Sequence, residues 1–592
     1  MLTPDRPSSF AYIHAKCIWI DLILLLLVFA PLYFLYLGHS PFATPDEARY
    51  VEIPREILAT GDWVTPRLNG VKYFEKPPLL YWIEAIFQSI FGIKEWAMRL
   101  PITLFGLSGI LGTYLFGQRI FNRQTGLLAA FILGSSGLYF ALSRLIILDM
   151  TVSIFITLSL FSFYVAHLEN TLYKRRFYYA LFTLFCALAV LTKGIMAIAI
   201  IGCVIVLWAT LSGSWKSIFP TFLPTNILLF LSITAPWHIM ASLRNPEFAY
   251  KYFIVEHVLR YTTTIHARYQ PVWFFIPILI GGFFPWSAFF APALIKAFRN
   301  RASSHYLFLL IWILFVFTFF SLSHSKLIPY ILPLFPPMAL LISCLLDEWL
   351  SQSIANETEI QLKPQIKSPE QRLVYLFILC LLLGIGSCQI HFFFPEINTD
   401  KILLKPYVNI LSFCFFATAL CAIPIPLCRN YISNLNILKR LSLNNPLAIR
   451  LSGISLLSLI ILLFLIPASP HIIRPSLQPL VTIALQQRQP NEPFVAYMKY
   501  FQDLPLYAHE RVVVVETKDE LLFGTEVEDT TSWMIGNDYF KKMLVHGKTR
   551  YWIFARIDGL TRLKQENPHI EFKEISCDRG VCLVVNTIKL EK

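Results

Sequence analysis

Residues 17–38 read CIWIDLILLLLVFAPLYFLYLG, and they decide the class of the fold. Asp21 is the only charged residue in this stretch. A helix needs about 20 mostly apolar residues to cross the hydrocarbon core of a bilayer, so the stretch predicts a membrane-spanning helix. It lacks the pattern of a cleavable signal peptide, and we expect it to be the first anchor of the chain.

The composition of the whole chain agrees with that first stretch. Of the 592 residues, 56% are hydrophobic and only 15% are charged, and the mean hydropathy is +0.58. Soluble domains carry about 25% charged residues, so a soluble globular fold is excluded, as are a disordered chain and a small disulfide scaffold. The net charge of +13 belongs to the cytoplasmic loops of a membrane protein and does not indicate nucleic acid binding. The sequence therefore predicts a polytopic α-helical membrane protein.

Segments of sufficient length and hydropathy predict about thirteen transmembrane helices. They lie at 17–38, 97–117, 126–142, 150–166, 177–190, 195–209, 219–239, 272–295, 306–322, 327–346, 373–393, 405–427 and 451–469. The stretch 79–91 is shorter, contains Glu84 and follows Pro77-Pro78, which favours a helix lying in the membrane interface. An odd number of spans places the two ends of the chain on opposite sides of the membrane.

The distribution of basic residues orients these helices. With the N-terminus inside, five of the six cytoplasmic loops hold 13 Lys or Arg and a single acid, whereas the outward loops are less basic for their length. The sixth loop, 347–372, carries more acids than basic residues and gives weak support. The tail, 470–592, is then outside, which in a bacterium means the periplasmic face of the inner membrane.

The tail has the composition of a small α/β domain of about 100 residues. Its hydrophobic patterns predict two buried strands, a hairpin and a helix, at 512–515, 551–554, 575–585 and 538–545. Cys577 and Cys582 flank the turn of the hairpin, and a periplasmic location favours a disulfide between them. We therefore expect two domains, 1–470 in the membrane and 471–592 in the periplasm.

The long outward segment 39–96 is the first candidate for function, because loops of this length often carry binding or catalytic residues. It contains Thr44-Pro45-Asp46-Glu47 and continues to Tyr73-Phe74-Glu75-Lys76-Pro77. One interpretation is a helix start in which Asp46 caps the helix or complements its dipole. The other is a positioned carboxylate that acts as a general base. The segment alone leaves both open.

Further polar residues lie on the same predicted side of the membrane, near the ends of spans. They are Arg144, Asp149, Lys193, Glu256, His257, Arg260, His324 and Lys326. Each alone has a structural explanation, since a Lys at the end of a span usually extends its amine to the interface. A transporter would instead place ionisable groups near the bilayer midplane, on broken helices in repeated halves, and the sequence shows no such pattern.

Acids and several cations beside apolar helices suit a lipid-linked phosphate. The cations would bind the phosphate, the apolar grooves would hold the lipid, and an acid would activate an acceptor. This combination predicts glycosyl transfer from a polyprenyl-phosphate sugar. A transporter of lipid-linked sugars or a non-catalytic scaffold is the alternative from another class.

These segments together resemble the membrane glycosyltransferases of the protein O-mannosyltransferase superfamily, and most closely the bacterial branch that contains the 4-amino-4-deoxy-L-arabinose transferase of lipid A. The resemblance covers roughly residues 40–340. It is carried by Asp46-Glu47, Tyr73-Phe74-Glu75-Lys76-Pro77, Arg144 with Asp149, Leu191-Thr192-Lys193-Gly194, Glu256-His257-Val258-Leu259-Arg260, and the stretch from Lys326 through Tyr330 to Pro333.

The resemblance implies a fold of the GT-C type, an undecaprenyl-phosphate sugar as donor, and inversion at the anomeric carbon. The implied reaction moves 4-amino-4-deoxy-L-arabinose to lipid A, a lipopolysaccharide modification linked to polymyxin resistance. A protein O-mannosyltransferase-like enzyme, or another glycan glycosyltransferase with a different polyprenyl-phosphate sugar, is the alternative. No cofactor is implied as required, although a divalent cation such as zinc enters through two matched positions.

Matched residue by residue, the resemblance implies roles for individual side chains. Asp46 corresponds to the principal catalytic aspartate, Asp149 to a second functional aspartate, and Lys76 to the lysine that meets the donor phosphate. The other positions expected around the phosphate and the cavity are Arg49, Tyr73, Lys193, Arg260 and Tyr330. Glu75 and His257 match positions that hold a structural zinc ion, but two ligands are too few to establish zinc from sequence.

The two acids of Asp46-Glu47 cannot share one role. Neighbouring residues of a helix point to different faces, so Glu47 is expected to face away from the site that Asp46 serves.

Overall fold

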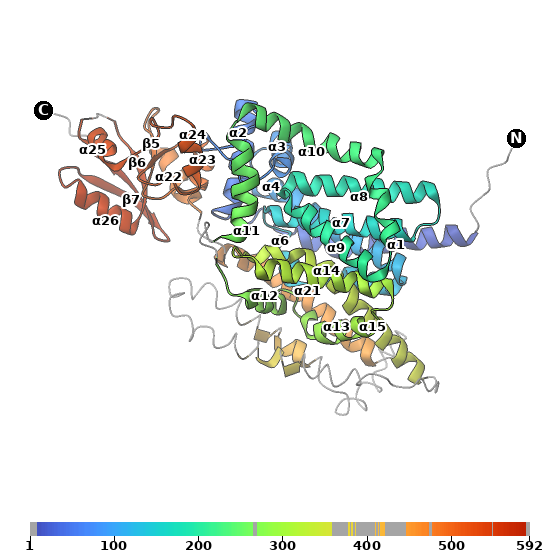
Figure 1. Cartoon of the computed structure of the whole chain (residues 1–592). Coiled ribbons are helices and arrows are strands. Elements are labelled where there is room, and N and C mark those ends of the chain that lie inside the picture. The colour runs from blue at the N-terminus through green and yellow to red at the C-terminus, as the bar shows by residue number, and fades with distance from the viewer. Residues whose placement is uncertain are drawn as a thin grey trace.

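The computed structural model describes residues 9–263, 269–357, 446–472, 476–546 and 549–587, together with separate residues between 377 and 420. Long helices form a bundle, and an α/β domain made of the C-terminal residues lies against one end of it (Figure 1). Helix α1 (Ser9–Phe34) begins at the opposite end of the bundle (Figure 1). The start of α1 and the C-terminal domain are thus separated along the length of the bundle.

Eight helices of the described residues are long and apolar enough to cross a membrane, and a ninth counts if one bent pair forms a single span. The eight are α1, α4 (Glu95–Ile120), α7 (Leu148–Leu168), α8 (Leu172–Lys193), α10 (Pro224–Arg244), α14 (Ser304–Leu322), η6 (Ile328–Leu334) continued by α15 (Phe335–Glu357), and α21 (Pro446–Ile472). The bent pair joins Val272–Gly282 to Trp286–Arg299 at 114° and includes α12 (Phe275–Gly282) and α13 (Phe290–Arg299). The chain is a multi-pass membrane protein, as the sequence predicted, and a count of thirteen spans is not confirmed.

The predicted span at 126–142 is wrong, because this stretch forms two short helices, α5 (Arg123–Gly134) and α6 (Gly137–Leu142). The break falls at Ser135 and Ser136, whose hydroxyls donate to carbonyl oxygens of the preceding turn at 2.6 Å. Ser135 Oγ also accepts a hydrogen bond from Trp286 Nε1 at 2.9 Å. These hydroxyls satisfy the carbonyl groups at the end of α5, so the helix can stop inside the bundle.

Three other predicted spans have different outcomes. The stretch 195–209 is the helix α9 (Met196–Ser212), which is apolar but shorter than the eight spans. The predicted spans 373–393 and 405–427 lie mostly outside the described residues.

The segment 39–96 folds into helices α2 (Asp46–Thr60) and α3 (Leu79–Phe91), joined by the small hairpin of β1 (Arg67–Leu68) and β2 (Val71–Lys72). Helix α3 confirms the helix predicted at 79–91, and its 13 residues are too few to span a bilayer. After α10, the chain continues as a π-helix, η3 (Tyr250–Leu259), and the short α11 (Arg260–Thr262).

The C-terminal residues form a six-stranded sheet in the order β5-β4-β3-β6-β8-β7. Its strands are β3 (Phe494–Tyr497), β4 (Val513–Val515), β5 (Met534–Ile535), β6 (Trp552–Arg556), β7 (Phe572–Asp578) and β8 (Val581–Asn586). The first four in spatial order are parallel, whereas β8 and β7 are antiparallel. The predicted strands, the helix α25 (Asn537–His546) and the hairpin are confirmed, and Cys577 and Cys582 form a disulfide.

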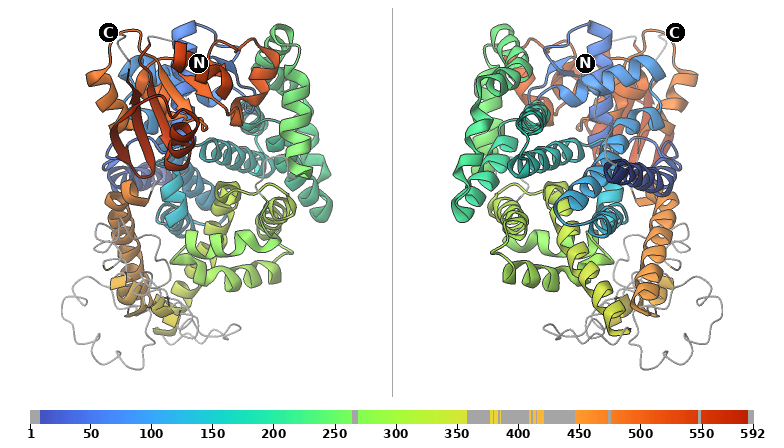
Figure 2. Two further views of the ribbon diagram at one scale, coloured as in Figure 1. Left: turned by 90° about the vertical axis from the view of Figure 1, so that its left-hand side faces the viewer. Right: turned by 90° about the vertical axis from the view of Figure 1, so that its right-hand side faces the viewer.

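The sheet has an apolar core on each face. One core contains helices α22 (Gln478–Gln487) and α23 (Asp503–Ala508) and includes Ile53 and Ile57 of α2. The other contains α25 and α26 (Ile557–Glu566). Since α2 contributes to the first core, the C-terminal domain packs directly on the segment that carries Asp46 (Figure 2).

Candidate active site

The two acids at the start of α2 point to different surroundings. Asp46 is the first residue of the helix, after Pro45 at the N-cap position, and its side chain is 59% exposed. Glu47 is 1% exposed and accepts hydrogen bonds from Arg99 Nε at 2.9 Å and Nη2 at 2.7 Å. Glu47 also accepts the backbone N–H of Ile146 at 3.0 Å. Glu47 is therefore a structural residue, and Asp46 is the acid that remains accessible.

Arg49, one turn along α2, connects Asp46 to the C-terminal domain. Arg49 Nη2 donates to Asp46 Oδ1 at 2.6 Å, and Nη1 donates to Tyr73 Oη at 3.0 Å and to Glu520 Oε2 at 2.5 Å. Glu520 belongs to η9 (Asp519–Leu521), in the tail. Burial raises the pKa of Glu520, and the positive charge of Arg49 opposes that rise.

A second pair of charges joins the ends of two spans. Asp149 lies in the first turn of α7, and its carboxylate forms an ion pair with Lys193, the last residue of α8. The Lys193 ammonium lies 4.2 Å from the centre of the Tyr330 ring, within the range of a cation–π contact. Asp149 thus holds Lys193 in place over Tyr330.

Three further charges converge on Glu256 of the π-helix η3. Arg260 Nη1 lies 2.9 Å from Glu256 Oε2, Lys251 Nζ lies 3.0 Å from Oε1, and Lys76 Nζ lies 3.9 Å from Oε2. Arg260 Nη2 also donates to Tyr330 Oη at 3.4 Å. Arg260 Nη1 also lies 3.7 Å from Glu75 Oε2, and three cations beside two carboxylates leave a net positive site.

The electrostatics of Lys76 agree with that surplus of positive charge. Burial, followed by the nearby charge of Arg260, lowers the pKa of Lys76 to about 7. An anionic phosphate beside the amine would favour its charged form and raise this pKa again. Lys76 is therefore placed to gain from binding an anion.

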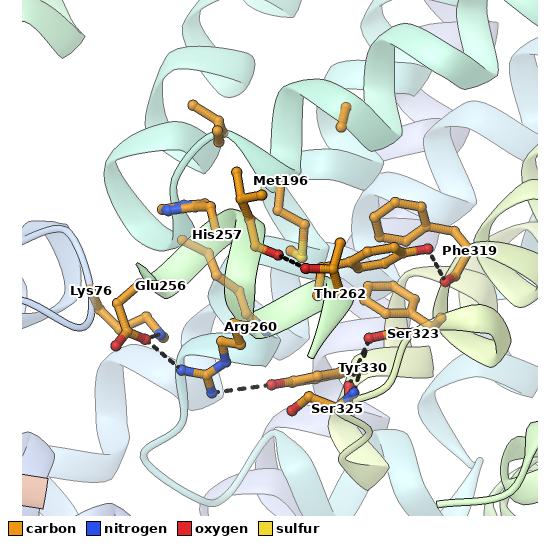
Figure 3. A pocket seen from close by; sticks show the side chains of 16 residues that line it. Lys76, Met196, Glu256, His257, Arg260, Thr262, Phe319, Ser323, Ser325 and Tyr330 are labelled. Atoms are coloured by element: carbon orange, nitrogen blue, oxygen red, sulfur yellow. Dashed lines mark hydrogen bonds and ion pairs between the residues drawn. The ribbon is translucent and has the colours of Figure 1, made fainter. Parts of the chain in front are cut away.

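Lys76 and Arg260, which converge on Glu256, border a cavity of about 330 Å³ that Tyr330 also lines. Figure 3 shows Lys76, Glu256, Arg260 and Tyr330 near one another on one side, with Met196 and Phe319 across from them. Lys193 and His257 also line the cavity. Its apolar wall includes Ile195, Met196, Ala199, Phe319 and Phe320. A cavity with cations at one end and apolar side chains beside them suits a phosphate attached to a lipid.

The candidate carboxylates lie close to this cavity without lining it. Burial raises the pKa of Tyr50, Arg49 opposes the rise, and the negative charges of Asp46, Asp149 and Glu75 add to it. The Tyr50 side chain is therefore within electrostatic range of all three acids, and its ring stacks on Tyr81 with centroids 5.9 Å apart. The sequence analysis did not single out Tyr50, although it directly follows Arg49.

Two residues from the predicted polar cluster are not part of this site. Arg144 donates to the carbonyl oxygens of Tyr33 at 2.5 Å and Leu35 at 2.7 Å. Lys326 donates to the carbonyl oxygens of Gln270 at 2.8 Å and Ser323 at 2.6 Å. Both side chains hold backbone at the ends of spans, which is the structural alternative for an isolated cation.

Among the described residues, Glu75 and His257 lack the further ligands that a structural zinc site needs. Glu75 and His257 belong to no group of three candidate ligands among the described residues, and His257 Nδ1 lies 2.6 Å from the carbonyl oxygen of Tyr252. The group that is found, Glu574 with Cys577 and Cys582, contains the disulfide. Structural zinc takes four ligands, and the surroundings of Glu75 and His257 do not supply them among the described residues.

Comparison with known proteins adds to this geometry. Residues 18–250 match the family described as dolichyl-phosphate-mannose-protein mannosyltransferase. Over 97% of its length the chain superposes on ArnT from Cupriavidus metallidurans bound to undecaprenyl phosphate, with a TM-score of 0.79, 28% identity and 98% of that chain covered. The chain has a fold of the GT-C type. The superposed length includes both the helical bundle and the C-terminal sheet.

Curated relatives are similar over part of their length. An undecaprenyl phosphate-alpha-4-amino-4-deoxy-L-arabinose arabinosyl transferase from Aeromonas hydrophila is 35% identical over 321 residues, which is 53% of this chain and 58% of that protein. The enzyme of the same name from Yersinia enterocolitica is 36% identical over 322 residues, 54% of this chain and 58% of that protein. The chain therefore matches somewhat more than half the length of these GT-C relatives.

Proposed function

We propose that this GT-C protein transfers 4-amino-4-deoxy-L-arabinose from undecaprenyl phosphate to lipid A. The observation that carries the proposal is the cavity bounded by Lys76, Lys193 and Arg260 at one end and by apolar side chains beside them. This arrangement suits a phosphate attached to a long lipid. The names of the similar arabinosyl transferases and of the similar ArnT structure both include such a lipid, undecaprenyl phosphate.

In the proposed reaction the cations bind the donor phosphate and stabilise it as it leaves. The bond between the anomeric carbon and the phosphate oxygen breaks, and its electron pair stays on undecaprenyl phosphate. An oxygen of a lipid A phosphate attacks the opposite face of the anomeric carbon, which inverts its configuration. Lys76, Lys193 and Arg260 offset the charge that develops on the leaving phosphate.

The role of Asp46 follows from the acceptor. A lipid A phosphate is already ionised near neutral pH, so it needs no base. Asp46 would then orient the sugar and offset the positive charge that develops at the anomeric carbon, with Asp149 holding Lys193 at the phosphate. The family name of the matched model favours a second candidate, a protein hydroxyl as acceptor, and there Asp46 would remove a proton as general base.

We place the reaction at the periplasmic face of the bacterial inner membrane, with residues 471–592 as a periplasmic domain. The basic predicted cytoplasmic loops and the start of α1 at the far end of the bundle support this orientation. The acceptor and the orientation are parts of the proposal.

A transfer assay with purified full-length protein tests the function. The protein is incubated with undecaprenyl phosphate-linked 4-amino-4-deoxy-L-arabinose and lipid A, and mass spectrometry reports a pentosamine adduct on lipid A. Adduct formation is expected from the wild-type protein and not after boiling. Absence of an adduct, with transfer to a hydroxyl peptide from a mannosyl donor, would favour the second candidate.

A further inference from the structure

The C-terminal domain makes contacts on both sides of Asp46. Thr44 Oγ1, two residues before Asp46, donates to Asp503 Oδ2 at 3.2 Å. Arg49 Nη1, three residues after it, donates to Glu520 Oε2 at 2.5 Å. Asp503 is fully buried, and its Oδ2 also accepts the backbone N–H of Leu477 at 2.6 Å. The tail therefore fixes the chain that enters and leaves the turn carrying Asp46.

Glu520 is itself held by its own domain. Its second oxygen, Oε1, accepts a hydrogen bond from Gln502 Nε2 at 2.8 Å, so Gln502 and Arg49 each engage one oxygen of the carboxylate. The side chains of Arg49 and Glu520 are 7% and 14% exposed. A fixed, shielded carboxylate gives Arg49 one well-defined position.

Arg49 is shared between two carboxylates, and this sharing affects Asp46. Nη2 faces Asp46, whereas Nη1 faces Glu520 and the Tyr73 hydroxyl. Without Glu520, Asp46 would be the remaining carboxylate in an ion pair with Arg49 among the described residues. Arg49 could then turn toward Asp46 and hold it in a closed pair, as Arg99 holds Glu47.

We propose that Glu520 is a positioning residue supplied by the C-terminal domain, which holds Arg49 so that Asp46 stays oriented toward the sugar. Glu520 acts through Arg49, and it is not among the residues that line the cavity. This inference rests on the proposed function, because it takes Asp46 as the residue that faces the sugar. It makes the tail a part of the active site.

The test is Glu520→Gln in the full-length protein, assayed with the aminoarabinose donor and lipid A. The amide keeps the size of the side chain and its contact with Gln502 but removes the charge that attracts Arg49. We expect kcat to fall by about tenfold to a hundredfold, with the donor KM within about twofold of wild type. A wild-type kcat would overturn the inference.

Glu528→Gln is the matched control. Glu528 also lies in the tail and also binds the segment 39–96, through Arg67 Nη1 at 3.1 Å and the backbone N–H of Lys72 at 3.0 Å. It binds the hairpin of β1 and β2 instead of Arg49. A kcat near wild type is expected, and an equal loss in Glu520→Gln and Glu528→Gln would show general loosening of the domain and overturn the inference.

A double-mutant cycle separates positioning from a purely structural role. If Glu520 acts through Arg49, then Glu520→Gln adds little to the loss of kcat caused by Arg49→Gln, whereas independent effects would multiply. Multiplied effects would overturn the inference. If Glu520→Gln does not fold, Gln502→Leu takes its place, since it frees Glu520 without removing its charge; a lower kcat is expected, and an unchanged kcat overturns the inference.

The outcomes for the two proposals are distinct. An inactive wild-type protein with this donor and lipid A would count against the proposed function. An active wild-type protein with an unaffected Glu520→Gln variant would count only against the role of Glu520.

Discussion

The ion pair of Glu47 with Arg99 and the ion pair of Asp46 with Arg49 begin on adjacent residues and differ physically. Glu47 and Arg99 are both buried, and Arg99 donates to both oxygens of the carboxylate. Asp46 is mostly exposed, and its partner Arg49 is shared with Glu520 and Tyr73. We call the buried pair the closed region, and the exposed Asp46 with Arg49, Glu520 and Tyr73 the open region.

This difference distinguishes a structural carboxylate from an accessible one in a site that contains many charged side chains. A buried carboxylate whose oxygens are all engaged cannot meet a substrate without losing those bonds, so the closed region fixes the start of α2. A carboxylate with an accessible oxygen and a shared partner can interact with a ligand at little cost. The open region is therefore where we place the reacting sugar.

The largest expected effect is on the closed region. Arg99→Ala would leave Glu47 buried without its charge partner, and breaking such a pair costs about 3–5 kcal/mol of stability. We expect a large loss of monodisperse protein and a strongly lowered unfolding temperature in detergent. Arg49→Gln, in the open region, serves as the comparison and should fold; equal unfolding temperatures for the two variants would erase the distinction between the regions.

The second-largest effect is expected at Lys76, which lines the cavity. Lys76→Ala should raise the donor KM by about tenfold to a hundredfold, because a hydrogen bond to a charged group contributes about 1.5–3 kcal/mol. The unfolding temperature should stay near wild type, and Lys76→Arg should recover part of the affinity because it keeps the charge. A donor KM equal to that of wild type would remove the phosphate-binding role.

A smaller effect is expected from the apolar wall of the cavity. Phe319→Ala should weaken binding of the long-chain donor by about fivefold, since it removes part of the apolar surface offered to the lipid. A donor analogue with a short lipid chain should bind equally to both proteins. Equal loss for long and short chains would show that Phe319 supports the fold and not the lipid.

The smallest effect on turnover is expected at the hairpin of β7 and β8. Replacing Cys577 and Cys582 by Ser should leave kcat and donor KM near wild type, because the pair lies at the turn of an edge hairpin. The cross-link closes a short loop and contributes about 2 kcal/mol at most. In wild-type protein the two thiols should resist labelling until reduced; ready labelling without a reductant would contradict the disulfide.

Much of the fold followed from local sequence patterns. Long apolar stretches predicted the membrane class, and the short stretch before Gly92 predicted α3, because length and hydropathy act within one helix. The strands around Val514 and Ile553 followed from their buried runs. The break between α5 and α6 was not predicted, because the local bonds of Ser135 and Ser136 are joined there by a hydrogen bond from Trp286, 151 residues from Ser135, which no local pattern displays.

The candidate site was likewise predicted only in part from the sequence. Six residues were predicted, through the resemblance, to gather around a phosphate. Lys76, Lys193, Arg260 and Tyr330 do line one cavity, whereas Arg49 and Tyr73 do not line it. The ion-pair partners of Arg49 and Glu47 were not predicted. Glu520 meets Arg49 across 471 residues, and Arg99 meets Glu47 across 52 residues. Pairings of that kind are set by the packing of separate elements, which a single sequence does not display.

In the proposed function, this chain transfers aminoarabinose to lipid A with the help of Asp46. The most direct measurement is mass spectrometry of lipid A from cells that lack the chain, cells that carry it, and cells that carry Asp46→Asn at equal protein level. We expect a pentosamine adduct on lipid A only from the cells that carry the intact chain. An unchanged lipid A with the intact chain, or an equal adduct with Asp46→Asn, would contradict it.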